Sequence, residues 1–329
     1  MNQEKIKVFE TMVRSDYPEI AGIVVQKNGN RLYENYFNGY AADQAIHVYS
    51  VTKSIVSGLI GIAIDKGQIK SVDQKVLDFF PDYAVQAGEK TIPEVTIKNL
   101  LTMTAPYKYQ LEPYEAFFAS ENWVAAALDL LGGEEQIGEF RYSPIIGAHI
   151  LSGILVKATG QPIIEFATKN LFSLLGINEM DNVVLRSEEE QMAFYAKEKH
   201  TNGWVVDPQG INTASWGLTL TPVDMAKIGQ LYLNGGLWEG KQIISKQWID
   251  ISTQEHIRWN SLSYGYLWWI IDDKEQSYAA LGDGGNVIYV NTKKKMVISI
   301  ASLLIPDAKD RIELIVKTIE PIFADYKVG

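Results

Sequence analysis

The chain has 329 residues, no cysteine and a formal net charge of −10. An acidic protein surface repels phosphate backbones and anionic lipids, so neither nucleic acid nor a membrane surface is expected as the main partner. The absence of cysteine excludes disulfides, thiolate nucleophiles and thiolate metal ligands. Hydrophobic residues make up 47% of the chain, which is typical of a globular protein with a substantial core.

The first residues form a polar, amphipathic segment without the apolar stretch and cleavage site of a secretion signal. The chain as it stands therefore predicts a cytoplasmic protein, or an extracytoplasmic one if a signal peptide has been removed. The most apolar run, residues 55–64, is too short to span a bilayer and predicts a buried helix. We expect a monomer or a weak homo-oligomer.

Alternating apolar residues near the amino terminus predict a β-hairpin. Residues 22–26 and 31–36 flank Asn28-Gly29, a dipeptide that is typical of tight hairpin turns. The middle of the chain then favours helices over residues 99–103, 145–157 and 162–171.

A further helix is predicted to begin after Thr221, which is followed by Pro222 in the first turn and by Asp224 at the third helical position. Asn234-Gly235 ends this helix. The carboxyl-terminal part returns to strands over residues 264–271, 287–290 and 296–303, and closes with an amphipathic helix over residues 310–323.

Strands at both ends of the chain, with a helical middle, indicate an α/β fold built from both termini. We expect residues 1–49 and 211–329 to form an α/β domain with a central sheet. Residues 50–210 are expected to form a mostly helical domain, with the active site in the cleft between the two.

Ser50 and Lys53 are the first candidates for chemistry. Three residues apart at the start of the apolar helix, they lie on one helical face. A lysine beside a serine hydroxyl can activate it as a nucleophile without histidine, and S-x-x-K is a motif of penicillin-interacting serine enzymes. The alternative is an N-cap serine followed by a surface lysine.

Two other segments can complete such a site. Tyr142, ahead of the helix over residues 145–157, can relay a proton, although it can equally be a core tyrosine. The segment Gly282–Asn286 can bring backbone close to a ligand. Its Asn286 amide, together with that of Ser50, can form an oxyanion hole, whereas the alternative is a simple glycine-rich turn.

Competing hydrolase chemistries find no support. No serine lies in the G-x-S-x-G context of an α/β-hydrolase. The four histidines show no metal-ligand spacing, so neither a metal nor another cofactor is expected. They are His47, His149, His200 and His256, of which His47 lies near Ser50 in sequence and is more readily explained by a structural role.

In these segments the chain resembles the serine β-lactamase-related hydrolases, the superfamily of class C β-lactamases, DD-peptidases and β-lactamase-fold esterases. The resemblance covers nearly the whole chain in the family's order. It is carried by residues 50–54, 95–104 (T-I-x-x-L-L-T-M-T-S-G in the family), 140–143 (F-x-Y-S-N), 217–225 (G-L-x-S-T-x-x-D-M) and 282–285 (G-H-G-G or K-T-G). It implies a β-lactamase-like fold with an antiparallel sheet flanked by helices.

The resemblance implies that Ser50 is the acylated nucleophile, that Lys53 accepts its proton, and that Tyr142 assists and protonates the leaving group. No cofactor is implied. Substrate-contacting positions are expected at Asp283, Gly284, Gly285, Trp216, Tyr107 and Pro144. For Trp216 and Tyr107, as for Trp204 and Tyr109, packing within the protein is an equal alternative to a cleft wall.

Two positions depart from the family. Pro144 replaces the usual asparagine, which removes an amide that would hold a substrate carbonyl. Asp283 replaces the usual histidine or lysine, and its charge would repel a β-lactam carboxylate, pair with Lys53, or favour a cationic or neutral substrate. An esterase, amidase or peptidase acting on small substrates is therefore expected, rather than an efficient β-lactamase. The alternative is a penicillin-binding or sensor protein with a slow or inactive site.

Overall fold

The computed structural model describes residues 3–196, 202–305 and 308–324. Its centre is an eight-stranded antiparallel sheet in the order β2-β1-β14-β13-β12-β11-β10-β9, so that strands from the two ends of the chain pair directly. The strands are β1 (Ile20–Lys27), β2 (Asn30–Tyr36), β9 (Ile257–Trp259), β10 (Leu262–Tyr264), β11 (Trp269–Asp272), β12 (Ser277–Gly282), β13 (Asn286–Asn291) and β14 (Met296–Ser302).

One face of the sheet is covered by the terminal helices. Helix α1 (Gln3–Asp16) lies beside α11 (Arg311–Leu314) and α12 (Glu320–Ala324), which are joined by a π-helical turn at Ile315–Ile319. Phe9 and Phe323 belong to the apolar core beneath them, together with sheet residues such as Ile23 and Ile298. The antiparallel sheet and its flanking helices confirm the predicted fold class.

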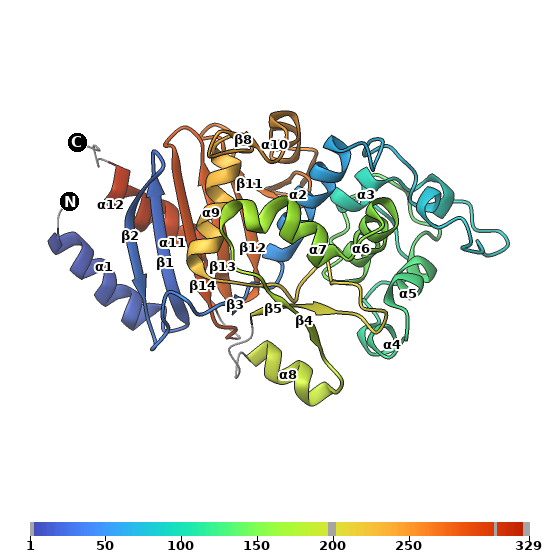
Figure 1. Ribbon diagram of the computed structural model, residues 1–329, viewed down its shortest axis with the longest axis horizontal. Helices are drawn as coiled ribbons and strands as arrows, with labels where there is room; N and C mark the ends of the chain where they lie inside the picture. Colours follow the sequence, from blue (N-terminus) through green and yellow to red (C-terminus); the bar gives the residue numbers. More distant parts are fainter. Residues whose placement is uncertain (1–2, 197–201, 306–307, 325–329) are drawn as a thin grey trace.

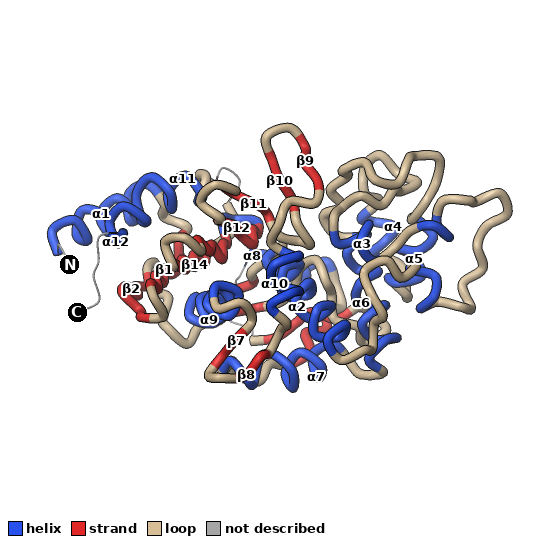
Figure 2. Tube along the Cα trace, turned by 90° about the horizontal axis from the view of Figure 1, so that it is seen from above, coloured by secondary structure: helices blue, strands red, loops and turns tan. Residues whose placement is uncertain are grey.

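The other face of the sheet carries α9 (Pro222–Leu233), which packs on β1, β13 and β14, and α2 (Val51–Asp65), which packs on β12 and β13. Figure 2 shows α9 and the terminal helices on opposite sides of the strands. The helical region lies beyond α2 and contains α3 (Ile97–Leu101), α4 (Tyr114–Phe118), α5 (Trp123–Leu130), α6 (Ile146–Thr159) and α7 (Ile163–Ala167).

Smaller elements complete the fold. Helix α8 (Glu188–Ala196) projects below the rest of the molecule in Figure 1, and α10 (Lys246–Ser252) packs near the sheet. Three two-stranded pairings connect loops: β3 (Ile46–His47) with β6 (Thr219–Leu220), β4 (Asp181–Val184) with β5 (Gly203–Val206), and β7 (Leu237–Trp238) with β8 (Lys241–Gln242). The proposed domain boundaries remain a prediction.

Local signals in the sequence explain several of these elements. Asn28 and Gly29 both have positive φ, at 51° and 77°, as the tight turn between β1 and β2 requires. Thr221 caps α9 by accepting a hydrogen bond from the Asp224 amide. Gly160 ends α6 in the left-handed conformation. The predicted first hairpin and the predicted ends of these two helices are therefore confirmed.

The prediction of a single strand over residues 264–271 is wrong. The segment forms the ends of two strands, β10 and β11, which pair with each other through Tyr264 and Trp269. Leu267 in the connecting turn has a φ of 61°. Apolar residues run through the turn itself because Tyr266 and Trp268 are buried in the core, and this continuous apolar pattern hides the turn.

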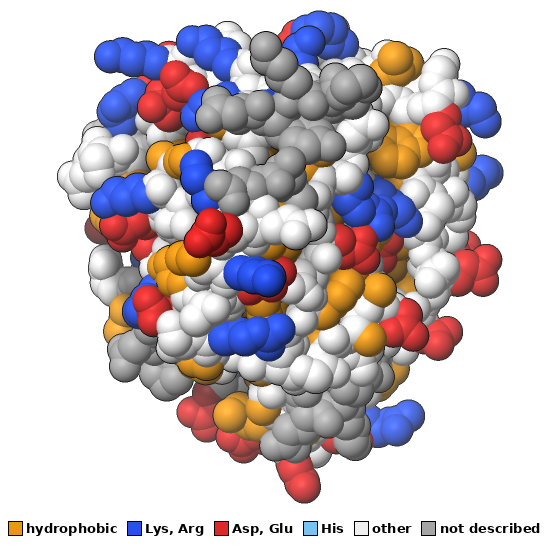
Figure 3. Space-filling view, turned by 90° about the vertical axis from the view of Figure 1, so that its left-hand side faces the viewer, with side chains coloured by type: hydrophobic (Ala, Val, Ile, Leu, Met, Phe, Trp, Pro, Cys, Tyr) orange, Lys and Arg blue, Asp and Glu red, His pale blue; other side chains and the backbone are white. Residues whose placement is uncertain are grey.

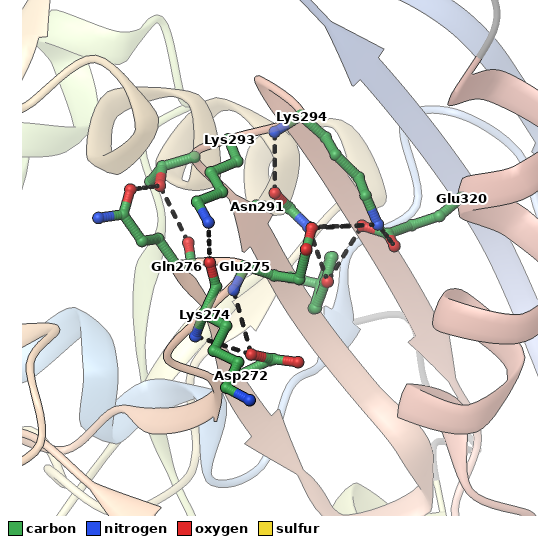
Figure 4. A network of polar contacts seen from close by, with 10 residues as sticks. Asp272, Lys274, Glu275, Gln276, Asn291, Lys293, Lys294 and Glu320 are labelled. Atoms are coloured by element: carbon green, nitrogen blue, oxygen red, sulfur yellow. Dashed lines mark hydrogen bonds and ion pairs between the residues drawn. The ribbon is translucent and has the colours of Figure 1, made fainter.

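A buried carboxylate ties α12 to the sheet. Glu320 accepts hydrogen bonds from Tyr289 and Asn291, each at 3.0 Å, and lies 2.6 Å from the Lys294 ammonium (Figure 4). The hydrogen bond with Glu320 is the main reason why the pKa of Lys294 is raised. The turn between β13 and β14 is therefore held against the closing helix.

The face at the terminal helices and β2 mixes both signs of charge with small apolar patches, without a basic stripe among its described side chains (Figure 3). Such a face offers no extended binding surface for a phosphate backbone. Within the described ranges, the helices are all too short or too polar to traverse a lipid bilayer.

Candidate active site

The amino terminus of α2 is placed by the pairing of β3 with β6. The Val48 amide donates to Leu218 O at 3.0 Å, and Tyr49 then adopts a φ of 48°. A positive φ is unfavourable for a bulky residue and persists only where the surrounding structure imposes it. This sharp turn presents Ser50 at the start of the buried helix.

Ser50 and Lys53 are in direct contact. The Lys53 ammonium nitrogen lies 2.7 Å from Ser50 Oγ, and Lys53 is only 1% exposed. The Ser50 hydroxyl makes no capping hydrogen bond to the backbone amides of α2. Of the two interpretations of this motif, the surface-lysine alternative is therefore wrong, and the pair has the geometry that proton transfer requires.

A second contact, from the segment that precedes β6, orients Lys53. Its nitrogen lies 3.3 Å from Ser215 O, in the segment that precedes β6. That segment is held in turn by His47, whose Nε2 accepts a hydrogen bond from the Gly217 amide at 2.9 Å. His47 is therefore a structural residue that holds the segment whose carbonyl faces Lys53.

Tyr142 lies on the other side of the lysine. The Lys53 nitrogen is 5.4 Å from the centre of the Tyr142 ring, and this ring packs against Tyr264 and Trp269. In the described part of the chain, the Tyr142 hydroxyl has no hydrogen bond to Ser50 or Lys53. The loop is held by Met103, whose carbonyl accepts from the Arg141 amide at 2.7 Å. Through this hydrogen bond the segment 95–104 positions the loop that carries Tyr142.

The segment Gly282–Asn286 reaches the same place from the sheet. A Cβ atom built on Gly282 would overlap Val48 O and lie 3.3 Å from Ser50 N, so only glycine allows this approach. The Asn286 side chain is buried and bonds to Asp283 O at 2.8 Å and Ser302 O at 3.1 Å. Asn286 thus locks the turn, and the oxyanion role of its amide remains a prediction.

Gly284 and Gly285 form the tip of this turn, with φ values of 73° and 86°. Asp283 precedes them and is exposed. Within the described ranges, no lysine, arginine or histidine lies within ion-pair distance of Asp283. The expectation that Asp283 might pair with Lys53 is therefore wrong, and Lys53 keeps its contacts to Ser50 and Ser215.

A glutamate occupies the region of Pro144. Glu112 accepts hydrogen bonds from the Ile145 amide at 3.1 Å and the Ile146 amide at 3.2 Å, at the start of α6. It also accepts from Ser143 Oγ and from the Tyr109 hydroxyl. The carboxylate therefore lies at the positive end of α6. It brings an acidic group next to Pro144, the position at which the family carries a neutral amide.

The tyrosine and tryptophans predicted to line the site are buried. Tyr107 is 3% exposed and stacks beneath Tyr109 at 5.2 Å, so its burial does not favour direct contact with a substrate. Trp204 is fully buried and donates to Thr213 O, and is therefore not a cleft wall. Trp216 packs on Tyr195 at 5.1 Å.

Trp216 is itself only 3% exposed, so it supports the site from behind Tyr195. Three residues near the site carried no sequence signal: Glu112, Tyr114 and Tyr195. They lie in or beside the short helices α4 and α8, whose positions depend on tertiary packing. A motif search cannot find such residues because their spacing to Ser50 follows from loop lengths.

Two further histidines, His149 and His256, have structural contacts. His149 lies 3.3 Å from Asp207, with both side chains buried, and His256 stacks on Tyr266. Burial lowers the pKa of His256 below its ordinary value. His200 lies outside the described residues. Among those that are described, no three histidine, aspartate or glutamate side chains are grouped so as to hold a metal ion.

Comparison with known proteins identifies the family. The Beta-lactamase family model matches residues 10–315. The chain therefore belongs to the Beta-lactamase family and is a hydrolase of the β-lactamase fold, as the resemblance of its motifs implied.

Among individual proteins, the chain is similar to the 6-aminohexanoate-dimer hydrolase of Paenarthrobacter ureafaciens, with 21% identity over 87% of this chain and 73% of that protein. A family VIII carboxylesterase superposes with a TM-score of 0.70 at 16% identity, covering 96% of each chain. The octameric penicillin-binding protein homologue of Pyrococcus abyssi superposes with a TM-score of 0.71 at 21% identity, covering 98% of this chain and 77% of its own.

Proposed function

We propose that this protein hydrolyses small esters or amides through an acyl-enzyme on Ser50. The observation that carries this proposal is the 2.7 Å contact between Ser50 Oγ and the buried Lys53 nitrogen. The Lys53 side-chain nitrogen takes the hydroxyl proton as Ser50 Oγ attacks the substrate carbonyl carbon. The Ser215 carbonyl then accepts a hydrogen bond from the ammonium that forms.

The tetrahedral intermediate places a negative charge on the former carbonyl oxygen. We assign the two donors for this oxygen to the backbone amides of Ser50, at the start of α2, and Asn286, after the turn at residues 282–285. The closeness of Gly282 to Ser50 N supports a donor from this turn. Preorganised donors of this kind lower the barrier because they need no rearrangement as the charge develops.

Collapse of the intermediate breaks the bond to the leaving group. The leaving oxygen or nitrogen takes a proton from Lys53, with the Tyr142 hydroxyl as the relay. Water then attacks the Ser50 acyl-enzyme and loses a proton to Lys53 and Tyr142. This step releases the carboxylic acid product and restores the Ser50 hydroxyl. The 5.4 Å between the Lys53 side-chain nitrogen and the centre of the Tyr142 ring places this tyrosine beside the pair, which supports the role.

The substrate class follows from the charges around Ser50. Pro144 offers no amide donor, and Glu112 and Asp283 are both carboxylates, so an anionic β-lactam is a poor match. Esters and amides without a nearby carboxylate fit better. The names of two similar proteins, a carboxylesterase and a 6-aminohexanoate-dimer hydrolase, agree with this choice.

Covalent labelling tests the nucleophile. Incubation with a fluorophosphonate is expected to add one adduct, visible by intact mass, which maps to Ser50 and disappears in Ser50→Ala. The exposed Ser15→Ala variant is the matched control and should label fully. If the parent protein forms no adduct and does not hydrolyse short p-nitrophenyl esters, the site is a binding or sensor site and the proposal fails.

Substrate preference tests the charge argument. Turnover of a short p-nitrophenyl ester is expected to exceed that of a cephalosporin by at least about tenfold, because like charges across a binding site disfavour the wrong ligand. Absorbance assays with both substrates on one preparation measure the ratio. Faster cephalosporin hydrolysis would show that Asp283 does not repel the β-lactam carboxylate.

A further inference from the structure

Helix α6 begins without a capping side chain of its own. Its N-cap residue is Ile145, which has no polar side chain, and Pro144 precedes it. The first amides of a helix find no acceptor within the helix. Glu112, 33 residues before Ile145 in the chain, supplies the acceptor: it takes hydrogen bonds from the Ile145 amide at 3.1 Å and the Ile146 amide at 3.2 Å. A carboxylate from a separate loop therefore caps α6.

The same carboxylate holds the residue that follows Tyr142. Ser143 Oγ donates to Glu112 and accepts a hydrogen bond from the Gly147 amide at 2.8 Å, so this hydroxyl is fixed from both sides. The Tyr109 hydroxyl also donates to Glu112, at 3.2 Å. Within the described residues Glu112 forms no ion pair. Its charge is therefore stabilised by the amides at the positive end of α6 and by two hydroxyl groups.

Tyr142 itself lies in a segment without regular secondary structure and is only partly buried. Its position therefore depends on its neighbours. The amide of the preceding residue donates to Met103 O at 2.7 Å, and the following residue, Ser143, is held by Glu112. Without Glu112 the loop would be anchored on one side alone, and the phenol could move away from Lys53. A displacement of about 1 Å in a reacting group lowers a rate by about 10²-fold.

We propose that Glu112 is a positioning residue for Tyr142. It fixes the loop that carries the phenol, and through this loop it fixes the path by which a proton reaches the leaving group. A carboxylate suits this task because both of its oxygens accept: Oε1 takes Ser143 and Ile146, and Oε2 takes Ile145. Glutamine would present an N–H donor to one of these donors. This inference rests on the proposed function because it assigns a further residue to the same reaction.

The dependence of the rate on the leaving group tests this role. p-Nitrophenolate leaves without a proton, whereas an alkoxide must be protonated as it leaves, so the alkyl ester depends far more on Tyr142. In Glu112→Ala, the ratio of kcat/KM for p-nitrophenyl butyrate to that for ethyl butyrate should rise about tenfold, a fraction of what a positioned general acid contributes. Tyr142→Phe should raise the ratio at least as much, and the double variant no further, because both changes act on one step.

Glu115→Ala is the matched control, since Glu115 is an exposed glutamate in the neighbouring helix α4 and should leave the ratio unchanged. Absorbance follows the first ester and pH-stat titration the second. A loss of equal size for both esters in Glu112→Ala would show that Glu112 only stabilises the fold, and would overturn the inference. If Glu112→Ala does not fold, Glu112→Gln keeps one acceptor oxygen, and its ratio should rise in the same direction.

A measurement without substrate separates this inference from the proposed chemistry. In protein that contains 3-fluorotyrosine, the ¹⁹F resonance of Tyr142 is assigned by its loss in Tyr142→Phe. We expect this resonance to shift or broaden in Glu112→Ala and to stay unchanged in Glu115→Ala. An unmoved resonance would overturn the positioning role even if fluorophosphonate labels Ser50. A displaced resonance in a protein that fluorophosphonate does not label would overturn the hydrolase proposal and leave Glu112 as the residue that positions Tyr142.

Discussion

Replacing Lys53 with methionine is expected to lower kcat/KM for ester hydrolysis by roughly 10³-fold, within the range by which a positioned general base accelerates a reaction. Methionine fills similar space but cannot accept the Ser50 proton. We expect no loss in the free energy of unfolding, because Lys53 is buried without a carboxylate partner among the described residues and methionine removes the cost of burying a polar group.

The measurement combines steady-state kinetics with urea unfolding of the same preparations. Lys66→Met is the matched control, since Lys66 is exposed at the carboxyl end of the same helix and should keep full activity. If Lys53→Met retained the parental kcat/KM, another group would be the base. If Lys53→Met were instead partly unfolded, its folded fraction would be labelled with fluorophosphonate. The labelling rate would still report whether Ser50 is activated.

Replacing Gly282 with alanine is expected to lower kcat/KM by about 10²-fold, the scale on which a displacement of about 1 Å affects catalysis. The backbone of Gly282 is extended, with φ −132° and ψ 153°, so alanine itself is compatible with the conformation. The added methyl group would overlap Val48 O, which is backbone and cannot turn aside. The strand end or the amino terminus of α2 must therefore shift.

Gly58→Ala is the control that separates this effect from a general intolerance of added methyl groups in the core. Its Cβ would lie 3.2 Å from the Tyr232 hydroxyl and 3.3 Å from a terminal atom of Ile244, both of which are side-chain atoms. We expect near-parental activity for this variant, together with a gain in helix propensity. Fluorophosphonate labelling rates and melting temperatures of both variants check the contrast. Equal rates in Gly282→Ala and the parent protein would show that Gly282 does not position the nucleophile.

Local sequence signals anticipated the elements that local interactions determine. Asn28-Gly29 specifies its turn because both residues tolerate a positive φ. The run over residues 264–271 misled because its alternation continues through a turn. Its aromatic residues are buried by contacts with helices α9 and α10. Because the turn residues are therefore as apolar as the strand residues, the apolar pattern does not show where the strand ends.

The candidate site likewise has one part that local sequence predicts and another part that depends on tertiary packing. Ser50 and Lys53 lie one helical turn apart, so helical geometry alone predicted that they could meet. Tyr142 and Gly282 were placed beside them in sequence analysis only through the resemblance of ordered motifs. The loop of Tyr142 is positioned by the hydrogen bond from the Arg141 amide to the Met103 carbonyl. Gly282 is positioned by its place at the end of β12.

The sequence by itself indicated the family and brought Ser50 and Lys53 together as the proposed nucleophile and base, because motifs and the helical repeat are local features of the chain. Tertiary structure decided how the site is charged and walled. It left Asp283 without an ion pair to Lys53, placed Glu112 against the start of α6, and stacked Tyr195 on Tyr49, the neighbour of Ser50. These outcomes were not readable in advance because they depend on how separate loops pack, and an electrostatic interaction is set by distance in space rather than along the chain.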